Sequence, residues 1–210
     1  MGRESIDEPL VPLQRPTLFL LGINPAYANH DEEFVLKLQE KRLSVSGDDF
    51  YINDAAGNPF LHCKGKFFSL RSRMEFYDLR GQLLFIVKRK LMSMHITFEG
   101  HTPDESKVLF TVKNSWRTFG SARAKITFTN IDGQETELAL RGDFFDRKAS
   151  VTLGDPEGPL LCRISRSFLN KRYLLTGKDT YYLTIAPGVD AAFMAAICVC
   201  LDEKENESCY

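Results

Sequence analysis

The 210-residue sequence predicts an all-β fold with one central helix. We expect a closed antiparallel barrel of about 12 strands around a buried hydrophobic C-terminal helix. Three observations predict it: a hairpin turn signal recurs four times, short strand-like segments follow one another along the chain, and an apolar stretch precedes the C-terminus. Open strand edges invite aggregation, and closing the barrel removes them.

The turn signal is an Asp or Asn three positions before a Gly, preceded by two apolar residues at alternate positions. Alternating apolar residues indicate a strand with one buried face. Asp or Asn can open a turn by bonding its own backbone, and Gly accepts the positive φ of the closing position. Each copy therefore predicts a β-hairpin. The copies are Phe50-x-Ile52-x-Asp54-x-x-Gly57, Met74-x-Phe76-x-Asp78-x-x-Gly81, Ile126-x-Phe128-x-Asn130-x-x-Gly133 and Val151-x-Leu153-x-Asp155-x-x-Gly158.

Further strands are expected before, between and after these hairpins, because short apolar segments alternate with turn residues. A polar connection through Gly100, Thr102, Pro103 and Asp104 is expected in the middle of the chain. The additional strand segments are 34–38, 43–45, 83–87, 94–98, 108–113, 160–165, 172–175 and 181–185.

The apolar stretch 191–201 predicts a helix, with Asp190 as its N-cap after Pro187-Gly188. Four alanines favour the helix, and the alternative is a buried strand over 197–201. Eleven helical residues span roughly 16 Å, about half the thickness of a bilayer core, so we expect no transmembrane segment. A helix that is apolar on every side must lie in the core.

One domain with two short appendages is expected. Residues 1–32 contain four prolines, which interrupt a regular ladder, and predict an extended arm. Residues 33–205 form the barrel domain, and residues 206–210 form an acidic tail. A content of 43% hydrophobic and 26% charged residues is typical of a soluble globular domain, which we expect to be a monomer.

Charge and cysteine content bear on partners and compartment. A formal net charge of -1 gives no field that would attract nucleic acid, and none is expected as a partner. The five cysteines are odd in number and form no C-x-x-C pair, which favours reduced thiols in the cytosol. The apolar run 18–21 is too short for a signal peptide. We therefore expect a cytoplasmic protein, with peripheral membrane contact through a local patch.

Two further segments resemble the LURP-one-related family. They are Ala186-Pro187-Gly188-Val189-Asp190-Ala191-Ala192-Phe193, followed by Leu201-Asp202-Glu203-Lys204, and Gly142-Asp143-Phe144-Phe145-Asp146-Arg147-Lys148-Ala149. The resemblance covers about residues 33–205. It implies the fold of the tubby C-terminal domain and the phospholipid scramblases, a twelve-stranded barrel around a hydrophobic helix. Because tubby domains bind phosphoinositides and scramblases act on membranes, it also implies lipid contact by fold analogy.

No catalytic or metal-binding motif is present in the sequence. The four histidines show no H-E-x-x-H spacing, and neither G-x-S-x-G nor G-x-x-x-x-G-K-[ST] occurs. Trp116 is expected to pack in the core or at its rim. We therefore expect a binding module that is not an enzyme and needs no cofactor.

A local excess of positive charge marks residues 64–90, where eight basic residues accompany two acidic ones. Arg71 and Arg73 share a strand face, as do Lys88 and Lys90. One interpretation is a solvated outer face of the barrel. The other is a phosphate-binding surface, where each basic residue near an anionic leaflet contributes on the order of 1 kcal/mol. The candidate site residues are Lys88, Arg89, Lys90, Arg71, Arg73, Lys171 and Arg172.

Two functions follow as hypotheses. The first is a module that binds phosphoinositide or another anionic phospholipid head group at a membrane surface. The second is a protein-interaction or regulatory scaffold without a small ligand. A coherent basic face across neighbouring strands would favour the first, and an exposed apolar patch would favour the second.

Overall fold

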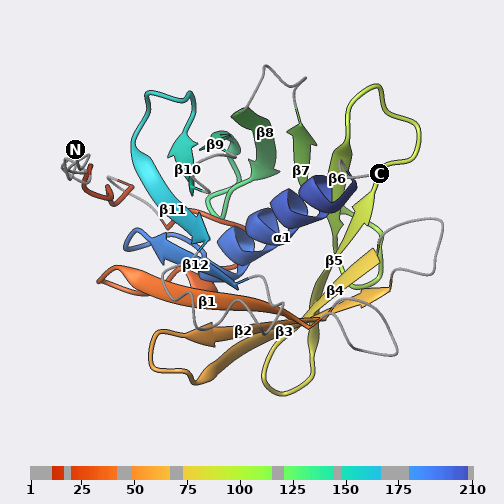
Figure 1. Cartoon of the computed structure of the whole chain (residues 1–210), viewed down its shortest axis with the longest axis horizontal. Coiled ribbons are helices and arrows are strands. Elements are labelled where there is room, and N and C mark those ends of the chain that lie inside the picture. The colour runs from red at the N-terminus through yellow and green to blue at the C-terminus, as the bar shows by residue number, and fades with distance from the viewer. Residues whose placement is uncertain are drawn as a thin grey trace, which may run out of the picture.

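A computed structural model describes residues 11–16, 20–41, 49–66, 73–114, 121–143, 148–166 and 180–207. Twelve strands close into one antiparallel barrel, and helix α1 runs through the ring (Figure 1). Each strand pairs with the next along the chain, and β1 pairs with β12 to complete the ring. The predicted barrel around a C-terminal helix is confirmed.

The element bounds follow the expected strand segments closely in most of the chain. A 3-10 turn, η1 (Pro25–Tyr27), precedes the barrel, and α1 (Ala191–Glu207) follows its last strand. The strands are β1 (Phe34–Lys41), β2 (Asp49–Asp54), β3 (Pro59–Lys66), β4 (Arg73–Tyr77), β5 (Leu83–Arg89), β6 (Thr97–His101), β7 (Val108–Asn114), β8 (Ser121–Thr129), β9 (Glu135–Asp143), β10 (Lys148–Leu153), β11 (Leu160–Arg166) and β12 (Thr180–Ile185).

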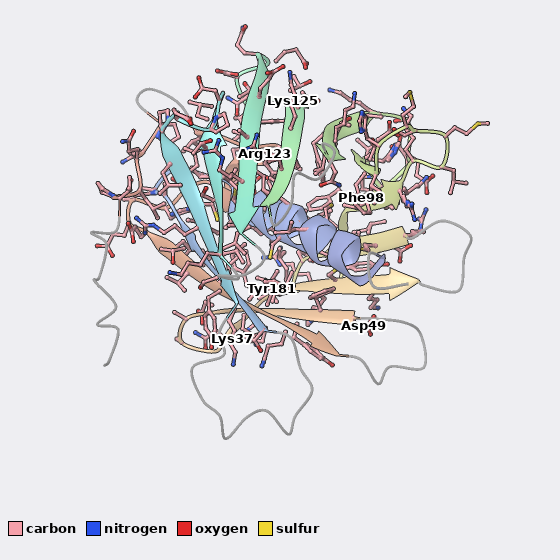
Figure 2. The ribbon with its side chains drawn as sticks, turned by 45° about the horizontal axis from the view of Figure 1, so that its top comes forward. Lys37, Asp49, Phe98, Arg123, Lys125 and Tyr181 are labelled. Carbon is pink, nitrogen blue, oxygen red and sulfur yellow. The ribbon has the colours of Figure 1, made fainter. Side chains whose placement is uncertain are left out.

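Side chains alternate between the barrel interior and the outer surface, as the period of a strand requires. Phe98 and Tyr181, labelled in Figure 2, are buried in the core around α1. All side chains of α1 from residue 191 to residue 201 are buried. The Phe193 ring lies 5.0 Å from the Phe110 ring and 4.9 Å from the Phe128 ring, measured between centroids. The helix is therefore the centre of the hydrophobic core.

Helix α1 is longer than the sequence pattern predicts. It continues past Leu201 to Glu207, because Glu and Lys are good helix formers that need no apolar environment. The alternative strand over 197–201 is wrong. No helix among the described residues is long and apolar enough to cross a membrane.

Three of the four recurring turns have the predicted backbone. Gly57, Gly81 and Gly133 have φ values of 88°, 80° and 83°, and each donates its N–H to the carbonyl of the residue three positions earlier. In the fourth turn Gly154, not Gly158, has the positive φ, at 74°. Gly158 is required for a different reason, because a Cβ there would lie 1.9 Å from the carbonyl oxygen of Leu153.

Strand β6 begins and ends later than expected. The sequence predicts a strand over 94–98 with Gly100 in a connection, whereas β6 spans Thr97–His101 and contains Gly100. Gly100 leaves room for Phe110, since a Cβ at this position would lie 2.1 Å from a ring carbon of Phe110. The expected strands 43–45 and 172–175, and Trp116, lie outside the described residues.

The described part of the 1–32 arm packs against the end of the barrel where α1 begins. Leu21 forms a parallel bridge with Val189, and the N–H of Gly22 donates to Asn130 Oδ1 over 2.8 Å. Asp190 caps the helix, as predicted, by accepting the N–H of Phe193 at 3.0 Å. The same carboxylate accepts the N–H of Asn24 at 2.9 Å, so one side chain connects the arm to the helix.

Candidate functional site

The interior of the barrel is occupied by α1 and by the aromatic side chains around it. Lys37, Arg123 and Lys125, labelled in Figure 2, belong to strands of the ring, whereas Phe98 and Tyr181 are buried in the core. A ligand must therefore be sought on the outer surface. The region that the sequence singles out, residues 64–90, includes the end of β3 and all of β4 and β5, and β6 pairs with β5 beside it.

Charged and polar side chains from these strands form two neighbouring hydrogen-bonded sets, here together called the β4–β6 cluster. Met74 and Phe76 point into the core, so the alternating residues of β4 face outward. Residues of β5, β6 and the β6–β7 loop complete the group. The members of the cluster are Arg73, Glu75, Tyr77, Lys88, Lys90, Glu99, His101 and Glu105.

Glu105 is the centre of the cluster. Arg73 and Lys88 are directly opposite one another on β4 and β5, and both donate to the carboxylate of Glu105. Hydrogen bonds from Lys88 and Arg73 lower the pKa of Glu105 to about 2. Glu105 has a φ of 61°, a left-handed conformation that is uncommon for residues other than Gly. Two cations on adjacent strands thus converge on one carboxylate.

Glu75 is the second acidic partner of Arg73. Its Oε1 accepts the Nε–H of Arg73 at 2.9 Å, and its Oε2 accepts the hydroxyl of Tyr77 at 2.7 Å. Hydrogen bonds to Glu105 and Glu75 raise the pKa of Arg73, so the guanidinium stays charged. The pKa of Tyr77 is also raised, chiefly by its hydrogen bond to Glu75. Arg73 is therefore held from two sides.

The β6 side of the cluster carries Glu99. Lys90 Nζ donates to Glu99 Oε1 over 2.8 Å, and His101 Nε2 lies 3.6 Å from Glu99 Oε2. The Nδ1 atom of His101 is the one buried side-chain nitrogen or oxygen without a hydrogen-bond partner in the described part of the chain. His101 is thus the last member of the cluster on β6, next to Glu99.

The structure brings some of the predicted site residues together and leaves others undescribed. Arg73, Lys88 and Lys90 all join the β4–β6 cluster. Arg89 stands between Lys88 and Lys90 in the chain, so its side chain leaves from the opposite face of the strand. Arg71, Lys171 and Arg172 lie outside the described residues. Because Glu99 and Glu105 are outside the 64–90 window, counting charge along the sequence overstates the positive excess of this face.

Metal ligands do not gather on the described surface. Within the ranges that the structure describes, no group of three or more His, Cys, Asp or Glu side chains is placed to hold a metal ion. Arg73 and Lys88 are cations of the β4–β6 cluster, and both are paired with Glu105.

Comparison with known proteins identifies relatives of this chain in plants and bacteria. A sequence model of the family described as LURP-one-related matches residues 34–202. Protein LURP-one-related 1 of Arabidopsis thaliana is 30% identical over 172 residues, which cover 80% of this chain and 76% of that protein. Uncharacterized protein YxjI of Bacillus subtilis is 26% identical over 183 residues, 83% of this chain and 98% of that protein.

A solved structure supports the same fold. The X-ray structure of the Arabidopsis thaliana protein AT5G01750 superposes with a TM-score of 0.58 and covers 87% of this chain and 97% of its own. Because the two sequences are 21% identical, this likeness concerns the fold alone.

Proposed function

We propose that this chain, which belongs to the LURP-one-related family, is a non-enzymatic module that binds anionic phospholipid head groups on the outer surface of its barrel. Its working location is then the cytoplasmic surface of a membrane. The observation that carries the proposal is the convergence of Arg73 and Lys88 on one carboxylate.

A phosphate group can take the place of the Glu105 carboxylate. Guanidinium and ammonium groups bind carboxylates and phosphates by the same charge-assisted hydrogen bonds. The β4–β5 ladder places Arg73 and Lys88 opposite one another, and both side chains are already ordered on Glu105, so an anion that replaces Glu105 costs little additional side-chain freedom. Glu105 comes from a loop and not from a strand, and its departure leaves the barrel ladder intact.

The proposal predicts that Glu105→Gln strengthens binding to anionic vesicles. The substitution removes one negative charge between Arg73 and Lys88. A unit charge at a leaflet is worth about 1 kcal/mol, so affinity should rise about fivefold. Sedimentation with phosphatidylcholine vesicles that contain phosphatidylserine or phosphatidylinositol bisphosphate measures this change. Free inositol phosphate as competitor separates head-group recognition from recognition of the membrane.

Two further variants make the experiment specific. Glu137→Gln changes net charge equally but acts on β9, where Glu137 pairs with Lys125 over 2.6 Å, and should leave vesicle affinity unchanged. Arg73→Gln with Lys88→Gln should weaken binding tenfold or more, and added salt should erase the difference. Equal binding by wild type, Glu105→Gln and the double variant would contradict the assignment of the site.

A second candidate is the protein-interaction scaffold, which the mixed charge of the β4–β6 cluster favours. Arg73, Lys88 and Lys90 alternate with acidic partners, as in the polar rim of a protein interface. The same vesicle experiment decides between the two. If wild type and Glu105→Gln both fail to sediment with anionic vesicles at any salt concentration, the scaffold replaces the lipid module.

A further inference from the structure

Large apolar side chains are exposed together on the β5–β6 loop. Leu91, Met92 and Met94 are 55%, 95% and 88% exposed. Three of the seven exposed large hydrophobic residues in the described ranges thus lie within four positions. Single exposed hydrophobic residues are normal, but a group of them marks a contact surface. We call Leu91, Met92 and Met94 the apolar tip.

The apolar tip is carried by a loop of defined shape. Thr97 and Asn114, both buried, bond the base of the loop: Thr97 Oγ1 donates to the carbonyl of His95 over 3.0 Å, and Asn114 Nδ2 donates to that of Ile96 over 3.1 Å. Ser93 Oγ lies 3.0 Å from Thr97 Oγ1. These bonds hold the loop at Ser93, His95 and Ile96, next to Met92 and Met94. The loop projects from the rim of the barrel on which α1 ends (Figure 1).

Charge along the loop has a distinct order. Lys88, Arg89 and Lys90 immediately precede the apolar tip; Lys88 donates to Glu105 and Lys90 to Glu99, and residues 89–98 themselves contain no acidic side chain. Lys90 is half exposed at the base of the loop. A membrane surface has the matching order, because anionic head groups lie above the apolar acyl chains. Long basic side chains keep their charge at head-group depth while apolar neighbours enter the boundary below.

We infer that Leu91, Met92 and Met94 insert into the interface of an anionic lipid bilayer, with Lys90 at head-group depth. Methionine side chains are flexible and adapt to a fluid environment better than branched side chains do. The apolar tip also lacks the Trp, Tyr and Arg side chains that dominate protein hot spots. This inference rests on the proposed function, because it assigns the orientation in which the barrel meets its membrane.

Insertion adds a salt-resistant part to vesicle binding, since burial of apolar surface is not screened by ions. Met92→Ser with Met94→Ser should lower affinity for phosphatidylcholine–phosphatidylserine vesicles at least tenfold, and the loss should persist at high salt. The matched control is Leu79→Ser, at a residue that is 57% exposed on the β4–β5 turn, and it should bind as wild type does. Circular dichroism verifies that the variants are folded.

Depth can be measured directly with vesicles that carry bromine on their acyl chains. Tryptophan fluorescence of Met92→Trp should be quenched by these vesicles more strongly than that of Leu79→Trp, in which the same native Trp116 provides the background. If the two tryptophan variants are quenched equally, insertion is overturned.

The outcomes also separate this inference from the proposed function. Suppose that vesicle binding is lost in the variant Arg73→Gln with Lys88→Gln but persists in the serine double variant. Insertion is then overturned, while the proposed lipid-binding function is supported. If the wild type binds neutral and anionic vesicles equally and the serine double variant binds neither, the apolar tip inserts, but recognition of anionic lipid and the role of Lys90 at head-group depth are overturned. No vesicle binding overturns both. Sedimentation velocity measures whether the protein dimerises. A dimer that forms in the wild type and not in the serine double variant would overturn insertion, because the apolar tip would then contact a second copy of the chain.

Discussion

At the scale of single residues, Asp190 joins the N-terminal arm to the start of helix α1. Its side chain is fully buried at the start of α1, where Oδ1 accepts the N–H of Phe193 and Oδ2 accepts those of Ile23 and Asn24. The role of Asp190 as a helix cap is visible in the sequence, because Asp before an apolar run is a start signal. Its contacts with Ile23 and Asn24 are not visible there, since they join residues more than 160 positions apart.

Burial makes Asp190 a source of pH-dependent stability. Desolvation raises its pKa to about 6, against the opposing effect of the backbone N–H donors, whereas the carboxyl of the unfolded chain titrates near 3.8. Between these values the folded protein binds a proton that the unfolded chain has lost. The contribution of Asp190 to the free energy of unfolding is therefore complete below about pH 4 and is lost as pH rises to about 6.

Asp190→Asn should remove this pH dependence. Urea unfolding of both proteins from about pH 4 to pH 7 should show wild type losing up to about 3 kcal/mol relative to the variant, because one pKa unit corresponds to about 1.4 kcal/mol. The comparison cancels the contributions of other titrating groups. Parallel stability profiles for the two proteins would mean that Asp190 titrates in the folded state as it does in the unfolded chain.

At the scale of elements, β6 shows where reading the sequence fails. Gly next to Thr, Pro and Asp indicates a turn, so the sequence places Gly100 in a connection. In the structure Gly100 is a strand residue whose missing side chain makes room for Phe110 on the neighbouring strand β7. A glycine required by a ring on another strand leaves no local pattern. The hairpins at Gly57, Gly81 and Gly133 were predictable because their turn chemistry is local.

Gly100→Ala should test this close approach. The added Cβ would lie 2.1 Å from the Phe110 ring, so the ring or the strand must move, and overpacking of a core typically costs about 1 to 3 kcal/mol. Chemical denaturation measures the loss. Phe110→Leu supplies the double-mutant cycle, because the penalty of Gly100→Ala should shrink when the ring is absent. An undiminished penalty would place the strain elsewhere.

At the scale of the whole molecule, closure of the barrel can be predicted from the sequence, but the contacts that closure creates on the surface cannot. The number of strands and the apolar helix predict a filled barrel, because a helix without a polar face needs an enclosure. The ring also brings Glu99 and Glu105 over Arg73, Lys88 and Lys90. Charges counted along a 27-residue window cannot include such partners. The architecture is thus readable from the sequence, while the electrostatics of its surface depends on strand register.

Closure also determines how the molecule opens. Helix α1 has no exposed side chain between residues 191 and 201, and the strands around it form a ring that β1 and β12 complete. We expect the helix to reach water only when the ring separates. Separation removes ladder hydrogen bonds and exposes the core together, so local unfolding of α1 should cost as much as global unfolding.

Hydrogen exchange measures this directly. Amides of α1 between Met194 and Leu201 should exchange with the free energy of global unfolding, equal to that of buried strand amides in β1 and β12, and should follow it as urea is added. Asp190→Asn should shift helix and strand amides by the same amount, because both report one opening reaction. Exchange of α1 at a free energy about 2 kcal/mol or more below that of the strands would contradict this, since the helix would then leave the barrel without opening the ring.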